Sequence, residues 1–195
     1  ATVRKLEKAG RFADARAVAR ILQPEEPVFL FSAPQLLARL KTFQKGFPGT
    51  TSFAVKSNPS PDVIACLAKA GLKHWDVASV HEMEAVRAQT PKPVFHYHNP
   101  AKSRRELADA YGRHACRRSA VHSREELVAV AVREEAARRG YRPLLTFHPG
   151  SQTRDPQTYV RHIEAAARIA AAAGITLSKL NVGGGFPADY PNSKG

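Results

Sequence analysis

Short apolar runs alternate along the chain with longer segments in which apolar residues recur at helical spacing. The short runs, bounded by Gly, Pro and Ser, predict strands, and the longer segments predict amphipathic helices. The predicted strands are 28–31, 51–56, 73–77, 94–98, 119–121, 144–147 and 180–182. The predicted helices are 3–22, 34–45, 61–71, 79–89, 103–111, 123–139 and 156–174. This alternation is typical of βαβ units and a parallel sheet, arranged either as a (β/α) barrel or as a doubly wound sheet.

The stretch Phe53-Ala54-Val55-Lys56-Ser57-Asn58-Pro59 places a lysine where one apolar strand stops. At such a position the side chain is expected to be partly desolvated, which favours the neutral amine and makes it a nucleophile toward carbonyl groups. The alternative is a lysine that simply extends into solvent from the strand end. Lys56 is therefore a candidate site residue only in combination with others.

Other polar residues and a glycine triplet also follow predicted strands. They are Asp76, His96, His98, His148 and Gly183-Gly184-Gly185. In a barrel the carboxyl ends of the strands converge on one face, where the site lies. A doubly wound sheet would gather such residues at a single switch point. Contributions from so many strands favour the barrel.

The glycine triplet Gly183-Gly184-Gly185 can turn its backbone N–H groups toward an anion without interference from Cβ atoms, so it is a candidate phosphate cradle. His148 can stack on a flat cofactor ring, and Ser151 can hydrogen-bond a phosphate or ring oxygen. The alternatives are a tight turn for the glycines and an ordinary loop histidine for His148.

Two carboxylates follow the same predicted strand: Asp76 at its end and Glu82 in the next helix. At this position Asp76 could pair with Lys56. The alternative for Asp76 is an ordinary capping role at the strand end.

The segment His96-Tyr97-His98 is a rival signal, because alternate residues of a strand point the same way and can share a metal ion. Together with Lys56, His148 and a carboxylate, it leaves a metal-dependent barrel hydrolase as an alternative. A lone His-x-His on a strand more often serves packing, so we predict no metal site.

The net charge of +13 is unusual for a chain with an otherwise ordinary composition of 43% hydrophobic and 24% charged residues. The basic pairs are scattered and carry no interleaved aromatic residues, which favours solvated helix faces over a nucleic-acid surface. No apolar run is long enough to span a bilayer, and no apolar leader opens the chain. Two cysteines without metal-like spacing suit a reducing compartment, so a cytoplasmic protein without nucleic-acid or membrane partners is expected.

Taken together, these motifs resemble the fold type III pyridoxal-phosphate-dependent decarboxylases, the ornithine/diaminopimelate/arginine decarboxylase family with an alanine-racemase-like TIM barrel. Six segments carry the resemblance, in the order in which the family has them. They are Phe53-Ala-Val-Lys56-Ser-Asn-Pro59, Asp76-Val-Ala-Ser79 with Glu82, Asn99-Pro-Ala-Lys102, His122-Ser-Arg-Glu-Glu-Leu127, Phe147-His-Pro-Gly-Ser-Gln152 and Gly183-Gly-Gly-Phe-Pro187.

The resemblance implies that pyridoxal 5'-phosphate is the cofactor and that Lys56 attaches it covalently. It implies further that His148 stacks on the cofactor ring, and that Ser151 and Gly183-Gly184-Gly185 contact the phosphate. Asp76 and Glu82 would be partners near Lys56.

The activity implied is decarboxylation of a basic amino acid. The Asn-Pro and His-Pro-Gly segments look most like bacterial ornithine decarboxylases, so conversion of ornithine to putrescine in polyamine biosynthesis is expected. An inactive remnant that binds only cofactor or a partner is the alternative. A small cofactor-carrier barrel is another alternative, although it does not explain His148-Pro-Gly-Ser-Gln152.

The sequence also departs from the family pattern. Val121-His122-Ser123 stands where the family usually has Val-Asp-Ser, and the short distance from Leu127 to Phe147 leaves no room for one internal strand. The expected fold is therefore an incomplete (β/α)8 TIM barrel of about six βα units. Residues 1–27 would form an N-terminal helix and linker and residues 28–195 a partial cofactor-binding barrel. The last barrel strand and the C-terminal β-domain would be absent, and a complete family member would be a homodimer.

Overall fold

The computed structural model describes residues 12–99, 102–121, 144–172 and 176–187, and over these residues the protein is an α/β structure. The strands are β1 (Ser52–Ala54), β2 (His74–Val77), β3 (Val94–Tyr97), β4 (Ala120–Val121), β5 (Leu144–Thr146) and β6 (Lys179–Asn181). The helices are α1 (Ala15–Leu22), α2 (Ala33–Gly46), α3 (Pro61–Lys69), α4 (Val80–Arg87), α5 (Arg104–Gly112) and α8 (Pro156–Ala172), and a 3-10 turn, η1 (Val55–Ser57), follows β1.

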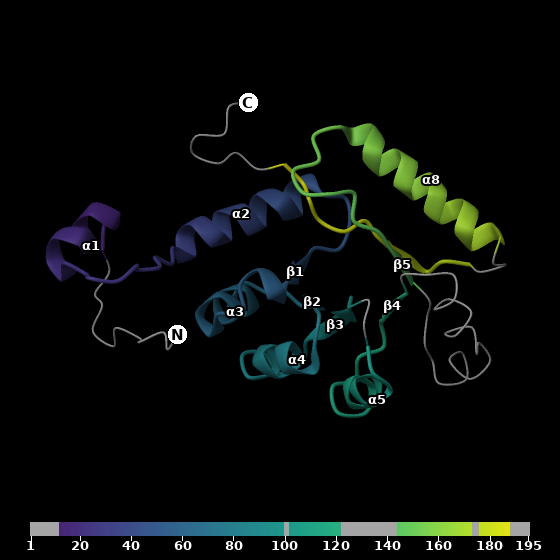
Figure 1. Cartoon of the computed structure of the whole chain (residues 1–195), viewed down its shortest axis with the longest axis horizontal. Coiled ribbons are helices and arrows are strands. Elements are labelled where there is room, and N and C mark those ends of the chain that lie inside the picture. The colour runs from purple at the N-terminus through teal and green to yellow at the C-terminus, as the bar shows by residue number, and fades with distance from the viewer. Residues whose placement is uncertain (1–11, 100–101, 122–143, 173–175, 188–195) are drawn as a thin grey trace.

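The described strands run parallel and follow one another in chain order. One group is β1-β2-β3 and the other is β4-β5-β6. A parallel bridge between Tyr97 and Ser119 joins the groups, and the Tyr97 N–H donates to the Arg118 carbonyl oxygen at 2.9 Å. In Figure 1 the strands lie in the middle, with α3, α4 and α5 on one side, α2 and α8 on the other, and α1 apart from them. Parallel strands in sequential order are those of an open, partial barrel.

Packing of apolar residues is concentrated on the outward face of β2 and β3. Trp75, Val77, Phe95 and Tyr97 alternate with less buried residues, and each is at most 2% exposed. They form one cluster with side chains from α3, α4 and α5, among them Ile64, Leu67, Met83, Val86 and Ala110. Because successive side chains of a strand point to opposite faces, the residues between them lie on the other face of the sheet.

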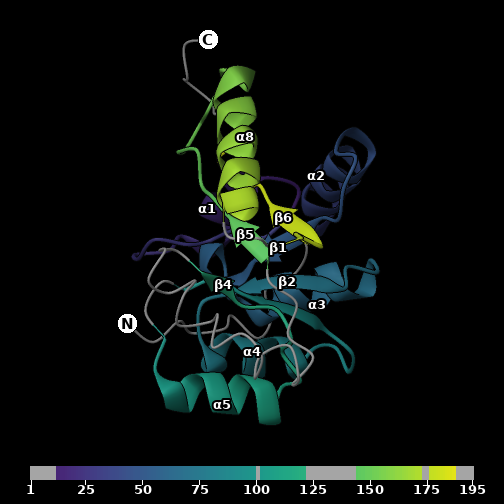
Figure 2. The same ribbon diagram turned by 90° about the vertical axis from the view of Figure 1, so that its right-hand side faces the viewer.

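That other face is polar. It carries His74 and Asp76 from β2 and His96 from β3, and the register aligns Asp76 with His96. Figure 2 gives the second view of the strands with their surrounding helices. The alternation along β2 and β3 therefore places apolar side chains on the outward face, against the helices, and polar side chains on the inner face, where a ligand could contact them.

Two expectations about the first strands were wrong. Residues 28–31 are extended but form no strand, and Phe29 is 94% exposed. The apolar run predicted a strand, but no neighbouring strand among the described residues hydrogen-bonds to it. β1 ends at Ala54 rather than at Lys56, because the chain turns into η1, where the Ser57 hydroxyl donates to the Ala54 carbonyl oxygen at 2.7 Å.

The remaining described elements confirm the predicted alternation to within a few residues. β4 pairs directly with β5, with Ala120 opposite Leu144, so no further strand lies between them in the described sheet. This agrees with the expectation that one internal strand is missing. The predicted helix 123–139 and the segment His122–Leu127 lie outside the described residues, as do residues 3–11 of the predicted helix 3–22. The prediction of helix at residues 12–14 was wrong, because Asp14 accepts the Ala17 N–H and caps α1, which begins at Ala15.

Candidate functional site

The candidate lysine lies in the turn that follows β1. Ala54 is in register with Asp76, and η1, which contains Lys56, packs against β2. Lys56 is exposed, and its ammonium group has no hydrogen bond or ion pair within the described part of the chain. The expected desolvation of the lysine is therefore absent, since its turn lies at the open rim of the strands.

Asp76 pairs with a histidine instead of with Lys56. Its Oδ1 lies 2.9 Å from Nδ1 of His98, and the two side chains are 27% and 7% exposed. Asp76 belongs to β2, and His98 directly follows β3, the neighbouring strand. The prediction of an Asp76–Lys56 pair is therefore wrong in this structure, because the register of the two strands brings a second ionisable group closer.

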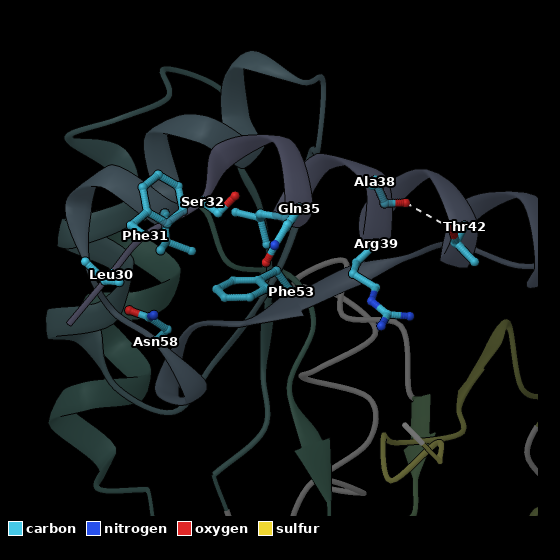
Figure 3. A pocket seen from close by; sticks show the side chains of 11 residues that line it. Leu30, Phe31, Ser32, Gln35, Ala38, Arg39, Thr42, Phe53 and Asn58 are labelled. Atoms are coloured by element: carbon cyan, nitrogen blue, oxygen red, sulfur yellow. Dashed lines mark hydrogen bonds between the residues drawn. The ribbon is translucent and has the colours of Figure 1, made fainter. Parts of the chain in front are cut away.

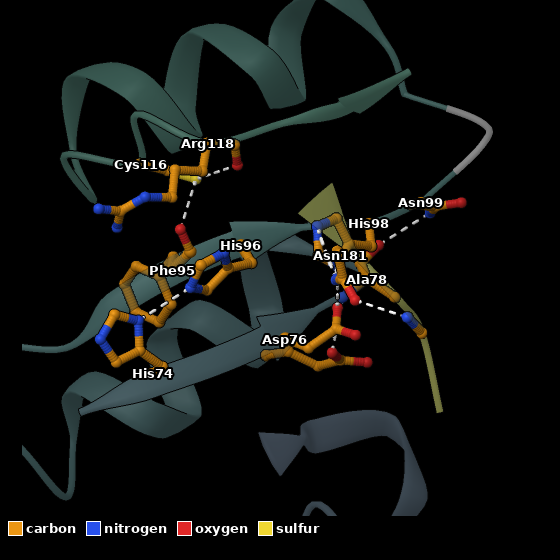
Figure 4. Close-up of polar contacts among 12 residues, drawn as sticks. His74, Asp76, Ala78, Phe95, His96, His98, Asn99, Cys116, Arg118 and Asn181 are labelled. Atoms are coloured by element: carbon orange, nitrogen blue, oxygen red, sulfur yellow. Dashed lines mark hydrogen bonds and ion pairs between the residues drawn. The ribbon is translucent and has the colours of Figure 1, made fainter. Parts of the chain in front are cut away.

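The same histidine contacts β6. Nδ2 of Asn181 lies 3.0 Å from Nδ1 and 3.4 Å from Nε2 of His98, and Oδ1 of Asn181 accepts the Gly183 N–H at 2.8 Å. Figure 4 shows Asp76, His98 and Asn181 meeting on the inner face. Sequence analysis gave Asn181 no role. Its place two residues before the glycine triplet was the only signal in the sequence.

Glu82 caps helix α4. It accepts the Ala78 N–H at 2.8 Å, while its own N–H donates to the Ser79 hydroxyl at 3.2 Å. This reciprocal arrangement satisfies backbone donors at the start of the helix. No contact between Glu82 and Lys56 occurs in the structure, so Glu82 shapes the β2–α4 turn rather than touching the lysine.

Two of the motifs that follow late strands pack directly against each other. Gly183, Gly185 and Gly150 have φ angles of +75°, +79° and +112°. A Cβ atom on Gly183 would collide with the Phe147 carbonyl oxygen, and one on Gly185 would collide with the Gly150 carbonyl oxygen. The Thr153 N–H also donates to the Gly185 carbonyl oxygen at 2.8 Å. Backbone-to-backbone packing that only glycine permits therefore joins the His148–Ser151 segment to the glycine loop.

The donors on these segments fit an anion. In the described part of the chain the N–H groups of Gly184 and Gly185 donate to no acceptor, and a Cβ on Gly184 would meet nothing within 4 Å. The Ser151 hydroxyl and the His148 ring are exposed, and neither makes a hydrogen bond to any residue that the structure describes. Gly183 is different because its N–H is already bonded to Asn181. The residues present thus fit a phosphate held by Gly184, Gly185 and Ser151.

An aromatic cluster, Phe43, Phe47, Tyr159 and Phe186, holds the glycine loop from outside. Phe186 stacks on Tyr159 with ring centroids 5.1 Å apart and an interplanar angle of 10°. It also makes T-shaped contacts, at 5.3 and 6.0 Å, with Phe43 of α2 and with Phe47, which caps the end of that helix. The Tyr159 hydroxyl on α8 donates to the Gly184 carbonyl oxygen at 3.0 Å. Sequence analysis missed this cluster, although Phe43 and Phe47 are four residues apart in the sequence and Phe186 follows the glycines.

The two histidines of the rival metal hypothesis have different partners. Nε2 of His96 lies 3.0 Å from Nδ1 of His74, whereas His98 pairs with Asp76. Burial, followed by the neighbouring His98 and Arg118, lowers the pKa of His96 to about 3. The described residues contain no group of three metal-ligating side chains, so the geometry gives no support to a metal-dependent hydrolase.

A cleft shares Phe53 and Asn58 with the lysine segment but is lined by none of the candidate site residues. It lies between the extended segment before α2, helix α2 itself and Phe53 (Figure 3). Leu30, Phe31, Gln35 and Arg39 are among its lining residues, and none of Lys56, Asp76, His148 or the glycines lines it. It is therefore not the site formed by the motifs.

Among the described helices none is long and apolar enough to cross a membrane.

A family model described as "Pyridoxal-dependent decarboxylase, pyridoxal binding domain" matches residues 34–142 and 132–195. A lysine/ornithine decarboxylase of Selenomonas ruminantium is 29% identical over 183 residues, which cover 73% of this chain and 46% of that protein.

Solved structures of the same kind are also similar. The structure of a lysine/ornithine decarboxylase from Vibrio vulnificus, complexed with cadaverine, matches with a TM-score of 0.73 at 24% identity. The match covers 91% of this chain and 58% of that chain. The structure of SrLDC with PLP and cadaverine matches with a TM-score of 0.69 at 25% identity, over 93% of this chain and 56% of that chain. An arginine decarboxylase of Paramecium bursaria Chlorella virus has a TM-score of 0.72 at 18% identity, covering 89% and 58%. These likenesses show the barrel fold, and the chain spans about half the length of its relatives.

Proposed function

Because the chain belongs to the pyridoxal-dependent decarboxylases by its pyridoxal-binding domain, we propose that it binds pyridoxal 5'-phosphate and contributes this site to the decarboxylation of a basic amino acid. The observation that carries the proposal is the pair of packed loops, one with the free N–H groups of Gly184 and Gly185 and the other with the exposed side chains of His148 and Ser151. The relatives named above are decarboxylases of lysine, ornithine or arginine.

The residues of this chain have distinct roles in the proposal. Lys56, with an unpaired and exposed amine, attaches the cofactor covalently. Gly184, Gly185 and Ser151 bind the phosphate, and Gly183 keeps the loop closed through Asn181. His148 lies against the ring of the cofactor. When bound, pyridoxal phosphate supplies the electron sink that decarboxylation needs.

Asp76 has a less direct role, because His98 holds its carboxylate. It contributes negative charge to the inner face beside the lysine turn, where η1 packs against β2. Glu82 fixes the turn between β2 and α4 from which Asp76 is presented.

The finer proposal is that ornithine is the substrate and putrescine the product, within polyamine biosynthesis, and that the complete protein acts as a homodimer. The support is the similarity of the Asn99–Lys102 and Phe147–Gln152 segments to bacterial ornithine decarboxylases. Parallel assays with ornithine, lysine and arginine test the choice of substrate, and ornithine is expected to give the highest kcat/KM.

The direct test of function is release of labelled CO2 from the three amino acids by purified protein with added pyridoxal phosphate. Lys56→Ala is expected to abolish release, while Lys69→Ala, an exposed lysine at the end of α3, leaves it unchanged. Release that persists in Lys56→Ala would contradict the role of Lys56. Binding of the cofactor without any release would restrict the function of this chain to holding the cofactor.

A further inference from the structure

The strands β3 and β6 are not neighbours, yet His98 and Asn181 meet. The strand order places β4 and β5 between them. In a flat sheet three strand spacings would separate the two backbones by about 14 Å. The side chains approach to 3.0 Å because both project onto the concave inner face of a curved sheet. This contact therefore crosses the inside of the barrel.

One hydrogen-bonded chain runs through His98. Asp76 Oδ1 lies 2.9 Å from His98 Nδ1, Asn181 Nδ2 lies 3.0 Å from the same Nδ1, and Asn181 Oδ1 accepts the Gly183 N–H at 2.8 Å. The backbone around His98 is held as well, since its N–H donates to the Val77 carbonyl oxygen at 3.0 Å. A carboxylate beside the lysine turn is thus linked to the first residue of the glycine loop.

The two neighbours of His98 meet its ring at the same edge. Nδ1 lies 2.9 Å from Asp76 Oδ1 and 3.0 Å from Asn181 Nδ2, while Nε2 lies 3.4 Å from Asn181 Nδ2. Asn181 uses its oxygen for Gly183, so it presents its NH2 group to the ring. The ring of His98 therefore holds the carboxylate and the amide together.

We propose that His98 is a positioning residue that presets the glycine loop for the cofactor: its ring, held by Asp76, orients the Asn181 amide that binds Gly183. This inference rests on the proposed cofactor-binding function. The φ of +75° at Gly183 turns the chain into the segment whose next two N–H groups are free, so the orientation of Asn181 sets where those groups point.

The first test is a titration with pyridoxal phosphate, followed by its visible absorption. His98→Ala is expected to weaken binding about tenfold, the effect of losing one well-placed hydrogen bond. His96→Ala is the matched control, because it removes a histidine two residues away that contacts His74 and not the chain through Asn181. It should change the affinity less than about twofold. Equal affinities of the wild-type protein and His98→Ala would overturn the inference while leaving the proposed function intact.

The second test needs no cofactor and therefore decides the inference even if the wild-type protein fails to bind it. Amide hydrogen exchange at Gly183 should be faster in His98→Ala than in His96→Ala, because a freed Asn181 amide no longer protects the Gly183 N–H. Unchanged exchange would overturn the inference.

Discussion

The two groups of strands differ in what holds them. The β1-β2-β3 group packs its outward face against α3, α4 and α5, and every member of the large buried cluster comes from residues 55–116. The β4-β5-β6 group carries the His148 and glycine loops, and within the described part of α8 only Ala166 and Ala170 are buried. The first group is therefore a packed scaffold, and the second is a set of ligand loops held by few apolar contacts.

Two features join the groups near the proposed cofactor site. One is the polar chain from Asp76 through His98 to Asn181. The other is the aromatic cluster that connects α2, α8 and Phe186. Stability and ligand binding therefore depend on different residues in this protein, so mutations should separate the two properties.

The largest effect on stability is expected from Trp75→Ala in the scaffold. Trp75 is fully buried, so its removal leaves a cavity and should lower the free energy of unfolding by about 3–5 kcal/mol. Ile169→Ala on α8, where the side chain is 51% exposed, is the control and should cost less than about 1 kcal/mol. Urea denaturation measures both. Similar losses in the two variants would contradict the division into scaffold and loops.

The converse test is Gly185→Ala in the glycine loop. Alanine is strained at a φ of +79°, and its Cβ would collide with the Gly150 carbonyl oxygen, so the two loops must separate. We expect the dissociation constant for pyridoxal phosphate to rise more than about tenfold, with a loss of unfolding free energy of about 1–3 kcal/mol. Gly184→Ala adds a Cβ that meets nothing within 4 Å and should change the affinity much less. Equal effects would show that contact between the loops does not shape the site.

Lowering the pH should destabilise the folded protein through His96, on the inner face of the scaffold. The pKa of His96 is lowered from 6.5 to about 3, so between these values the unfolded chain binds a proton that the folded chain does not. Stability should therefore fall as the pH falls below about 6.5, by at most about 1.4 kcal/mol per pH unit and on the order of 2 kcal/mol at pH 5.

His96→Gln should flatten this dependence, which denaturation at pH 7, 6 and 5 measures. Part of the slope should remain, because burial also lowers the pKa values of His74 and His114. The control is His148→Gln, an exposed histidine without hydrogen bonds in the described structure. An unchanged slope in His96→Gln would mean that His96 is not the group that takes up the proton on unfolding.

The smallest effect is expected from Tyr159→Phe, which keeps the stack on Phe186 but removes the hydrogen bond to the Gly184 carbonyl oxygen. A loss of about 1 kcal/mol in unfolding free energy is expected, together with a small decrease in cofactor affinity. Tyr159→Leu removes the ring as well and should affect both properties more. Identical behaviour of the two variants would assign no role to the stacked ring.

The order of the elements could be predicted because each depends on local signals. Ser79 and Ser103 accept N–H groups at the starts of α4 and α5, and Pro61 opens α3, as their positions in the sequence indicate. The segment 28–31 shows the limit of such signals, since an apolar run becomes a strand only where another strand supplies hydrogen bonds.

The positions of the candidate residues at strand ends were predictable, but their pairing was not. The glycines, His148 and Ser151 follow strands, and parallel strands bring their ends together. The partner of Asp76 depends on the register between β2 and β3, and the contact with Asn181 depends on the curvature of the sheet. Neither the register nor the curvature can be read from a local sequence pattern. The sequence therefore suggested Lys56 as the partner of Asp76 and gave no role to Asn181.

The most direct test of the cofactor site is to mix the protein with pyridoxal phosphate, reduce with borohydride and map the labelled peptide. The account predicts one stoichiometric adduct, on Lys56, which disappears in Lys56→Ala and persists in Lys69→Ala. Labelling spread over the exposed lysines, or the absence of any adduct, would contradict the claim that these loops form a cofactor site.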